Sequence, residues 1–155
     1  MKDLNTELEL FKKTRENILR LVETLSLDQI NKIPDGFTGN IAWHLGHMLV
    51  THKGLVYQLN SVAGNLDQEF VQKYKKDSKP EQPINQGELD YIKKELKSQV
   101  KELEEDVNSG DVFGKNIPYK TAYNYEITNL EDAVKFNNIH QAMHVGYILA
   151  LKNLV

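Results

Sequence analysis

The chain has 155 residues, of which 40% are apolar and 26% are charged, and its formal net charge is −3. This length suits one domain over residues 1–155 with a real hydrophobic core. The weak negative charge gives no reason to expect nucleic acid or acidic lipid as a partner. The absence of cysteine excludes disulfides, thiolate metal ligands and a cysteine nucleophile. Since the chain begins without a signal-peptide pattern and no apolar stretch approaches about 18 residues, we expect a cytoplasmic protein without a membrane span.

Two helices are predicted in the first half of the chain. Residues 6–25 carry apolar side chains on one helical stripe, and a second helix is expected over residues 40–62 with Asn40 as its N-cap. Residues 26–34 between them read as a short helical turn that ends at a proline. Gly54 lies inside the second predicted helix, and one interpretation is that another helix approaches closely there.

Two further helices are predicted in the second half, over residues 86–109 and 129–153. The first has an apolar repeat near 3.5 residues and a long charged face, which we interpret as solvated. A capping-box pattern precedes each helix. The residues of these patterns are Asn85 with Glu88, and Thr128 with Glu131.

Long connectors join the predicted helices. Residues 64–85 exceed what two antiparallel neighbours need, and they can recross a bundle about 30 Å tall. The second and third long helices should therefore run parallel, within an all-α four-helix bundle. A short helix is possible near residues 67–75. Alternation at residues 123–127 is compatible with a strand, but no partner strand is evident, so we expect an ordered loop.

Two of the five histidines, His140 and His144, lie four residues apart in the last predicted helix. This spacing places them on one face, one turn apart, where two imidazoles can bind one transition-metal ion. Apolar neighbours recur at helical spacing on roughly the same face, so we expect the pair to point into the protein interior. These neighbours are Phe136, Met143, Tyr147, Ile148 and Leu151.

A third ligand is expected from the second predicted helix, which carries His44, His47 and His52. A helical wheel centred near Met48 places His44 and His52 within about 40° of the middle of the apolar stripe. It places His47 at about 100°, on the edge of the stripe. Periodicity alone therefore favours His44 or His52. It does not exclude His47, because a stripe edge can face the last helix.

The two histidine-containing segments are Asn40-Ile-Ala-Trp-His-Leu-Gly-His-Met48 and His140-Gln-Ala-Met-His-Val-Gly146. In this order they resemble the DinB family, which includes YfiT-type metal-dependent enzymes and relatives that act as thiol transferases. The resemblance covers the whole chain in length, four helices, both long connectors and the order of the motifs. It implies a four-helix bundle with up-down-down-up topology, which agrees with the predicted crossover.

The resemblance also implies the ligand set. The family places one metal-binding histidine in the second helix, in a Trp-x-Leu-Gly-His-like context, and a His-x-x-x-His pair in the last helix. Carried over to this chain, these are His47, His140 and His144. His44 is then a neighbour of the ligands or incidental, and His52 is expected to be a surface histidine or one with satisfied hydrogen bonds.

Three neutral imidazoles leave an open coordination position, as at catalytic zinc sites. Zinc or nickel fits best, and iron or copper is also compatible with such ligands. Position 141 is Gln and position 137 is Asn. Neither the His-Glu-x-x-His of zinc proteases nor the Glu-x-x-His of di-iron bundles is therefore present.

Two functional hypotheses follow. The resemblance to thiol transferases implies an enzyme, a transferase or hydrolase, whose metal activates a small thiol or water for attack on an electrophilic small molecule. No catalytic base can be named, and Tyr119 or Tyr125 is expected to shape substrate access. The alternative is a non-catalytic, stress-related bundle in which the metal stabilises the fold or a dimer.

Packing expectations complete the sequence-based picture. Trp43 and Tyr147 are expected to be packing residues rather than substrate contacts. A homodimer is expected from the family and from apolar residues such as Leu10 and Leu21, which lie off the main stripe of the first helix.

Overall fold

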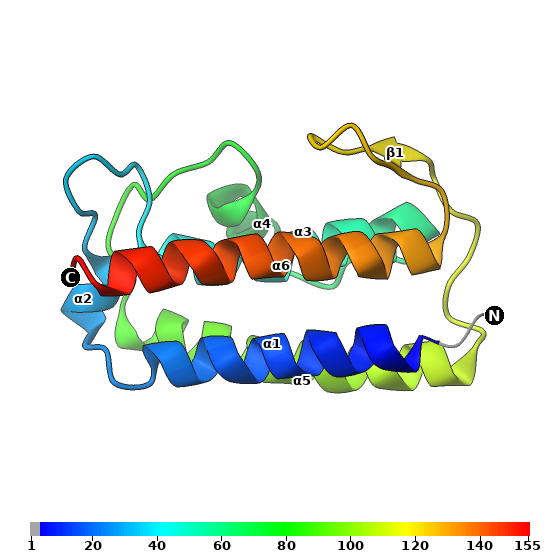
Figure 1. Ribbon diagram of the computed structural model, residues 1–155, viewed down its shortest axis with the longest axis horizontal. Coiled ribbons are helices and arrows are strands. Elements are labelled where there is room, and N and C mark those ends of the chain that lie inside the picture. Colours follow the sequence, from blue (N-terminus) through cyan, green and yellow to red (C-terminus); the bar gives the residue numbers. More distant parts are fainter. Residues whose placement is uncertain (1–3) are drawn as a thin grey trace.

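Four long helices form a bundle in the computed structural model, which describes residues 4–155 (Figure 1). The predicted all-α bundle is confirmed. The second long helix continues beyond its α-helical part through a π-helical turn, η1, and a short 3₁₀ turn, η2. The bounds are α1 Asn5–Val22, α3 Ile41–His52, η1 Lys53–Tyr57, η2 Gln58–Asn60, α5 Gln86–Ser109 and α6 Leu130–Lys152.

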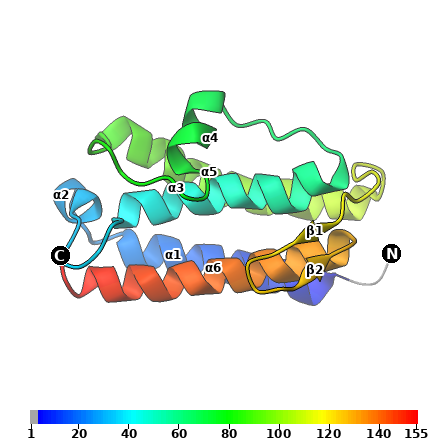
Figure 2. The ribbon, with the colours of Figure 1, turned by 90° about the horizontal axis from the view of Figure 1, so that it is seen from above.

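Each long helix contacts two others: α1 packs against α5 and α6, and α3 packs against the same two helices. Figure 2 shows α3 and α5 running from the end of the bundle that carries the C-terminus toward the opposite end. The remaining pair, α1 and α6, runs the other way. These are the directions that the long connectors predict, since two parallel neighbours need a chain segment that recrosses the bundle.

Short elements cover the ends and one side of the bundle. The helix α2 (Leu27–Asn31) begins at a capping box in which Ser26 and Gln29 bond reciprocally. The helix α4 (Gln68–Tyr74) lies in the first long connector, and the side chain of Asp67 caps its N-terminus. Both agree with the short helical segments predicted there.

The second long connector contains a two-stranded antiparallel sheet, β1 (Tyr119–Lys120) and β2 (Glu126–Ile127). The prediction of an ordered loop at residues 123–127 was therefore wrong for β2. Its partner, β1, is only two residues long, too short for an alternating pattern. A tight turn joins the strands, with Asn124 N–H donating to the Thr121 carbonyl at 3.0 Å.

The N-caps of three long helices, α3, α5 and α6, are asparagines, whereas α1 begins after Leu4 without a side-chain cap. The Asn40 side chain accepts from the backbone N–H of Trp43, and that of Asn85 accepts from Glu88, as predicted. The α6 cap is shifted by one residue from the predicted Thr128. Asn129 accepts from the N–H of Asp132 at 2.9 Å, because the Thr128 hydroxyl instead donates to the carboxylate of Asp132.

Glycines in the second long helix have different surroundings. A Cβ at Gly54 would meet only the end of the Gln58 side chain, at 3.9 Å, so the interpretation of a close helix contact there was wrong. The close contact occurs at Gly46, where a Cβ would overlap the ring of Tyr74. The absence of a side chain at Gly46 thus lets α4 rest directly on α3.

The main apolar core lies between the long helices and includes fully buried side chains from each of them, such as Ile18, Leu45, Ile92 and Ile148. Within residues 4–155, no helix combines the length and apolar character that crossing a membrane requires.

Candidate metal centre

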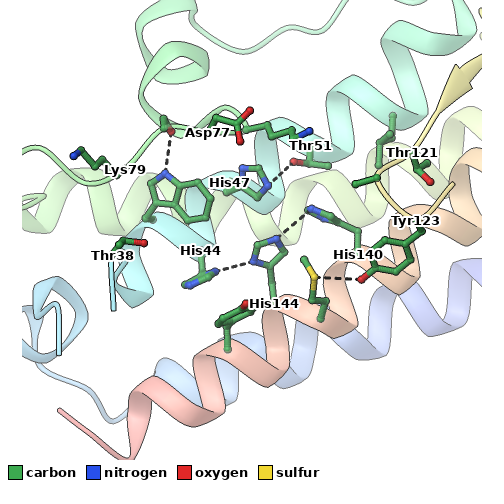
Figure 3. A pocket seen from close by; sticks show the side chains of 18 of the residues that line it. Thr38, His44, His47, Thr51, Asp77, Lys79, Thr121, Tyr123, His140 and His144 are labelled. Carbon is green, nitrogen blue, oxygen red and sulfur yellow. Dashed lines mark hydrogen bonds between the residues drawn. The ribbon is translucent and has the colours of Figure 1, made fainter. Parts of the chain in front are cut away.

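Three histidines from two helices converge at one side of the bundle: His47 from α3, and His140 and His144 from α6 (Figure 3). One ring nitrogen from each lies within 4.8 Å of the others. The Nε2 atoms of His140 and His144 are 3.2 Å apart. His47 and His144 are buried and His140 is half-buried. This group of side chains has the composition and spacing to hold one metal ion.

The orientation of His47 depends on α4. Its Nδ1–H donates to the backbone carbonyl of Tyr74 at 2.7 Å. A carbonyl can only accept, so Nδ1 carries the hydrogen and Nε2 keeps its lone pair. The hydroxyl of Thr51 lies 3.2 Å from this Nε2 and donates to it. Because Gly46 allows the ring of Tyr74 to rest on α3, the close helix contact and the orientation of the candidate ligand are linked.

Stacking on Trp43 fixes the plane of the His47 ring. The two rings stack at 4.5 Å between centroids with 12° between their planes. The indole Nε1–H of Trp43 donates to the hydroxyl of Ser78 at 2.9 Å. Trp43 therefore packs, as expected, but it packs against a candidate ligand and also lines a cavity.

The remaining histidines of α3 lie in different places. The geometry groups His47 with the α6 pair, although the helical wheel favoured His44 or His52. His44 contacts the pair from the side: its Nδ1 lies 2.7 Å from Nδ1 of His144. Both His44, near the middle of the α3 stripe, and His47, at its edge, therefore lie against α6, so their angles about the helix axis do not separate them.

His52 is neither exposed nor fully hydrogen-bonded, contrary to the sequence-based expectation. It is completely buried and stacks on Phe11 at 4.8 Å. Its Nδ1 lies 3.3 Å from the Asn137 side-chain nitrogen, and its Nε2 has no hydrogen-bond partner among the described residues. Its place is therefore the bundle core, away from the three grouped histidines.

Electrostatics favour the neutral form of the histidines in the group. Burial, followed by repulsion from neighbouring imidazoles, lowers the pKa of His140 to about 4 and that of His144 to about 2. Burial also lowers the pKa of His47, although the Tyr74 carbonyl and Asp77 oppose the shift. Neutral imidazole is the form that binds metals, so the rings need no deprotonation near neutral pH.

A cavity of about 540 Å³ opens above the three histidines. The loop before α3, the segment after α4, the β1–β2 turn and α6 all contribute to its walls. Tyr119 lines it, as expected, but Tyr125 does not and instead donates its hydroxyl to Asp132. Several other lining residues lie in irregular loops, where no periodic pattern predicts them: Thr38, Gly39, Lys76, Lys79 and Tyr123.

The apolar neighbours of the α6 histidines fall into two groups, those buried in the protein and those that are partly exposed and line the cavity. Phe136, Ile148 and Leu151 are buried, as expected. Met143 and Tyr147 are 36% and 47% exposed and line the cavity. The expectation that this whole face points into the interior was thus wrong for these two side chains, because the histidines lie on a cavity wall rather than inside the closed core.

Comparison with known proteins agrees with this arrangement. Residues 10–148 match the sequence profile of the DinB superfamily, and the matched region includes all three grouped histidines. The chain therefore belongs to the DinB superfamily. A search of curated proteins gave no significant match.

Proposed function

We propose that the chain is a metal-dependent enzyme that acts in the cytoplasm. In this proposal His47, His140 and His144 hold one divalent transition-metal ion, zinc or nickel in preference to iron or copper. The reaction is attack of a small thiol or a water molecule on an electrophilic small molecule. The observation that carries the proposal is three imidazole nitrogens within 4.8 Å of one another beneath a cavity of about 540 Å³.

The donor set suits such an ion. All three candidate ligands are neutral imidazoles, which bind zinc, nickel, copper and iron better than magnesium or calcium. The Nδ1–H of His47 is already bonded to a carbonyl, the usual partner of a metal-bound histidine, so its Nε2 keeps the lone pair that a metal ion requires. Nδ1 of His140 is buried without a partner among the described residues, and its Nε2 lies 3.2 Å from that of His144.

Bound there, a divalent ion would supply Lewis acidity, which favours hydroxide or thiolate near neutral pH. The protein supplies position and shelter. Trp43 and Tyr147 form aromatic walls beside the histidines, and the β1–β2 turn limits the access of bulk water from one side. The cavity volume fits a small-molecule substrate.

The cavity favours the enzyme over the non-catalytic alternative. A metal that only stabilises the fold or a dimer is typically enclosed by four protein ligands. Here three histidines form the group and open space lies above them. A substrate requires such a cavity, whereas an ion that only stabilises the fold or a dimer does not.

A direct test combines metal analysis with turnover. Purified protein is supplied with zinc or nickel, and the bound metal is measured by elemental analysis. The loaded protein is then assayed with a panel of small thiols and electrophiles. We expect about one ion per chain and turnover that the His144→Ala variant lacks. Failure to take up any supplied metal would overturn the proposal.

We also propose that the chain forms a homodimer through exposed apolar side chains of α1 and α6. Leu10, Ile139 and Leu149 are each about half exposed, at 54%, 53% and 45%. Leu21, which the sequence also suggested, packs against the core instead. Light scattering at tens of micromolar should give the mass of two chains. A monomer at that concentration would contradict the proposal, and Leu10→Glu with Ile139→Glu should convert a dimer to monomers.

A further inference from the structure

His44 forms the end of a row of three imidazoles. Its Nδ1 lies 2.7 Å from Nδ1 of His144, and Nε2 of His144 lies 3.2 Å from Nε2 of His140. Figure 3 shows the three rings joined in series by these two contacts. His144 is in the middle of the row and uses both of its ring nitrogens. Because a neutral imidazole carries one hydrogen, the protonation of one ring nitrogen of His144 determines whether the other donates or accepts a hydrogen bond.

The row has only one consistent arrangement of hydrogens once Nε2 of His144 gives its lone pair to a metal ion. The neutral ring of His144 must then carry its hydrogen on Nδ1. That hydrogen is donated to Nδ1 of His44, which must accept. The neutral ring of His44 consequently carries its own hydrogen on Nε2.

The Nε2 atom of His44 is open toward the cavity. His44 lines the cavity, and this nitrogen has no hydrogen-bond partner in the described part of the chain and is not sealed from solvent. Gly39 lies beside it: a Cβ at that position would be 3.8 Å from Nε2. The missing side chain leaves the nitrogen uncovered.

Aromatic contacts hold the His44 ring in this orientation. Tyr147 stacks on its face, with 5.1 Å between centroids and 17° between planes. Trp43 contacts it edge-on at 5.3 Å and 82°. The direction of the Nε2–H bond is thus fixed by packing before any ligand arrives, which is a requirement for a specific hydrogen-bond donor.

We propose that His44 positions the substrate, by presenting a fixed Nε2–H donor to an acceptor oxygen of the small molecule. The inference rests on the proposed function, since a metal on His144 sets the direction of the row. Two cationic side chains, Lys76 and Lys79, line the same cavity, and Asp77 contributes one carboxylate to its walls. The excess of positive charge favours a carboxylate as the acceptor. The substrate class is therefore a small molecule with a metal-directed group, such as a thiol, and a separate carboxylate.

The hydrogen on His44 can be observed directly. Long-range proton–nitrogen NMR spectra of the zinc-loaded, ¹⁵N-labelled protein distinguish a protonated from a bare ring nitrogen. We expect His44 with hydrogen on Nε2 and His144 with hydrogen on Nδ1. His52, buried elsewhere in the core, serves as the control whose signals zinc should not change.

Zinc content of the same sample separates the possible failures. One bound zinc with the His44 hydrogen on Nδ1 would overturn this inference and leave the proposed function intact. No zinc uptake would overturn both.

The acceptor preference is tested with two matched thiols, 3-mercaptopropionate and 1-propanethiol, which differ in the carboxylate. Binding to the cobalt(II)-loaded protein is followed by the thiolate-to-cobalt absorption band. We expect the carboxylate to tighten binding about tenfold. His44→Phe, which keeps an aromatic ring beside Tyr147, should abolish the difference. Equal affinity of both thiols for the unaltered protein would overturn the carboxylate assignment.

A second variant keeps the test decisive if His44→Phe does not fold. Gly39→Val leaves every histidine in place and covers Nε2 of His44. It should retain cobalt and lose the preference for 3-mercaptopropionate. Gly146→Ala is the matched control, because its Cβ would meet nothing within 4 Å, and it should keep the preference. A Gly39→Val protein that keeps the full preference would overturn the proposal.

Discussion

Hydrogen bonds at Nδ1 orient two of the three candidate ligands. His47 donates to the Tyr74 carbonyl, and His144 pairs with His44, each at 2.7 Å. Nδ1 of His140 is buried without a partner in the described residues. Since such partners fix the ring and raise its basicity, His140 is the least constrained of the three.

Alanine variants should rank the histidines by role. His47→Ala, His140→Ala and His144→Ala each remove one ligand and should sharply lower the metal content measured by elemental analysis. His52→Ala should leave it unchanged, because His52 lies in the core. His44→Ala should keep the stoichiometry and weaken zinc affinity about tenfold, the usual effect of losing a partner of a metal-bound histidine. Metal loss in His52→Ala with retention in His47→Ala would refute the assignment.

Acid should destabilise the metal-free protein in the range where its buried histidines resist protonation. Their pKa values in the folded protein are lowered, to about 4 for His44 and His140, whereas an unfolded histidine titrates near 6.5. Between these values the unfolded chain binds more protons, so the free energy of unfolding falls as pH drops from about 6.5 toward 4. The slope is roughly 1 kcal/mol per pH unit for each such histidine.

Urea unfolding of metal-free protein at several pH values measures this slope. His140→Phe removes one titrating ring and should make the slope shallower. A free energy of unfolding that does not change between pH 6.5 and 4.5 would contradict the expectation.

At the scale of elements, α4 links the first connector to the candidate metal centre. Its last residue, Tyr74, rests on Gly46 of α3, and its carbonyl accepts from His47. The Tyr74 hydroxyl donates to Glu88 of α5 at 2.6 Å, which ties the short helix to a second long one. A substitution at Gly46, beneath the ring of Tyr74, should therefore alter the orientation of His47 at the candidate metal centre.

Gly46→Ala tests that link. The added Cβ would overlap the ring of Tyr74, so α4 must shift and the hydrogen bond to His47 should lengthen or break. We expect a loss of about 1–3 kcal/mol in the free energy of unfolding and zinc binding weakened at least tenfold. Zinc competition titration and thermal unfolding measure the two effects. Gly146→Ala, with open space around its Cβ, is the control that should change neither. Unaltered zinc affinity in Gly46→Ala would show that α4 does not orient the ligand.

At the scale of the whole molecule, a polar layer crosses the middle of the bundle. The Arg15 guanidinium, from α1, is 1% exposed, and burial lowers its pKa to about 9. It donates to the Met48 carbonyl of α3 at 3.4 Å and to the Gln99 side chain of α5 at 3.3 Å. Gln99 in turn donates to the Leu49 carbonyl at 3.4 Å. A buried charge held by these few contacts is sensitive to the loss of any of them.

Variants of this layer should not behave additively. Gln99→Leu alone leaves the buried Arg15 without its side-chain acceptor and should cost about 1–3 kcal/mol in the free energy of unfolding. Adding Arg15→Met to Gln99→Leu removes the charge as well and should recover much of that loss. Urea unfolding of the single and double variants gives the comparison. A double variant that is less stable than Gln99→Leu alone would contradict this account.

Local patterns in the sequence determined where the helices lie and how they begin. The α5 bounds agree with the predicted 86–109, and Asn40 and Asn85 cap their helices as expected. These features depend on neighbouring residues, which a single segment of sequence contains. The four-residue spacing of His140 and His144 belongs to the same class, because the period of one helix places both on one face.

Only the tertiary structure decided which histidine of α3 meets that pair and what surrounds it. Helical periodicity gives the angle of a side chain about its own axis, and it does not say which neighbour lies at that angle. The packing of α3 against α6 placed the stripe edge with His47 at the site, brought His44 to His144 and left His52 in the core. The family resemblance selected His47 where periodicity did not. The cavity walls and the β1–β2 pair are decided by contacts between loops distant in sequence, for which the chain carries no periodic signal.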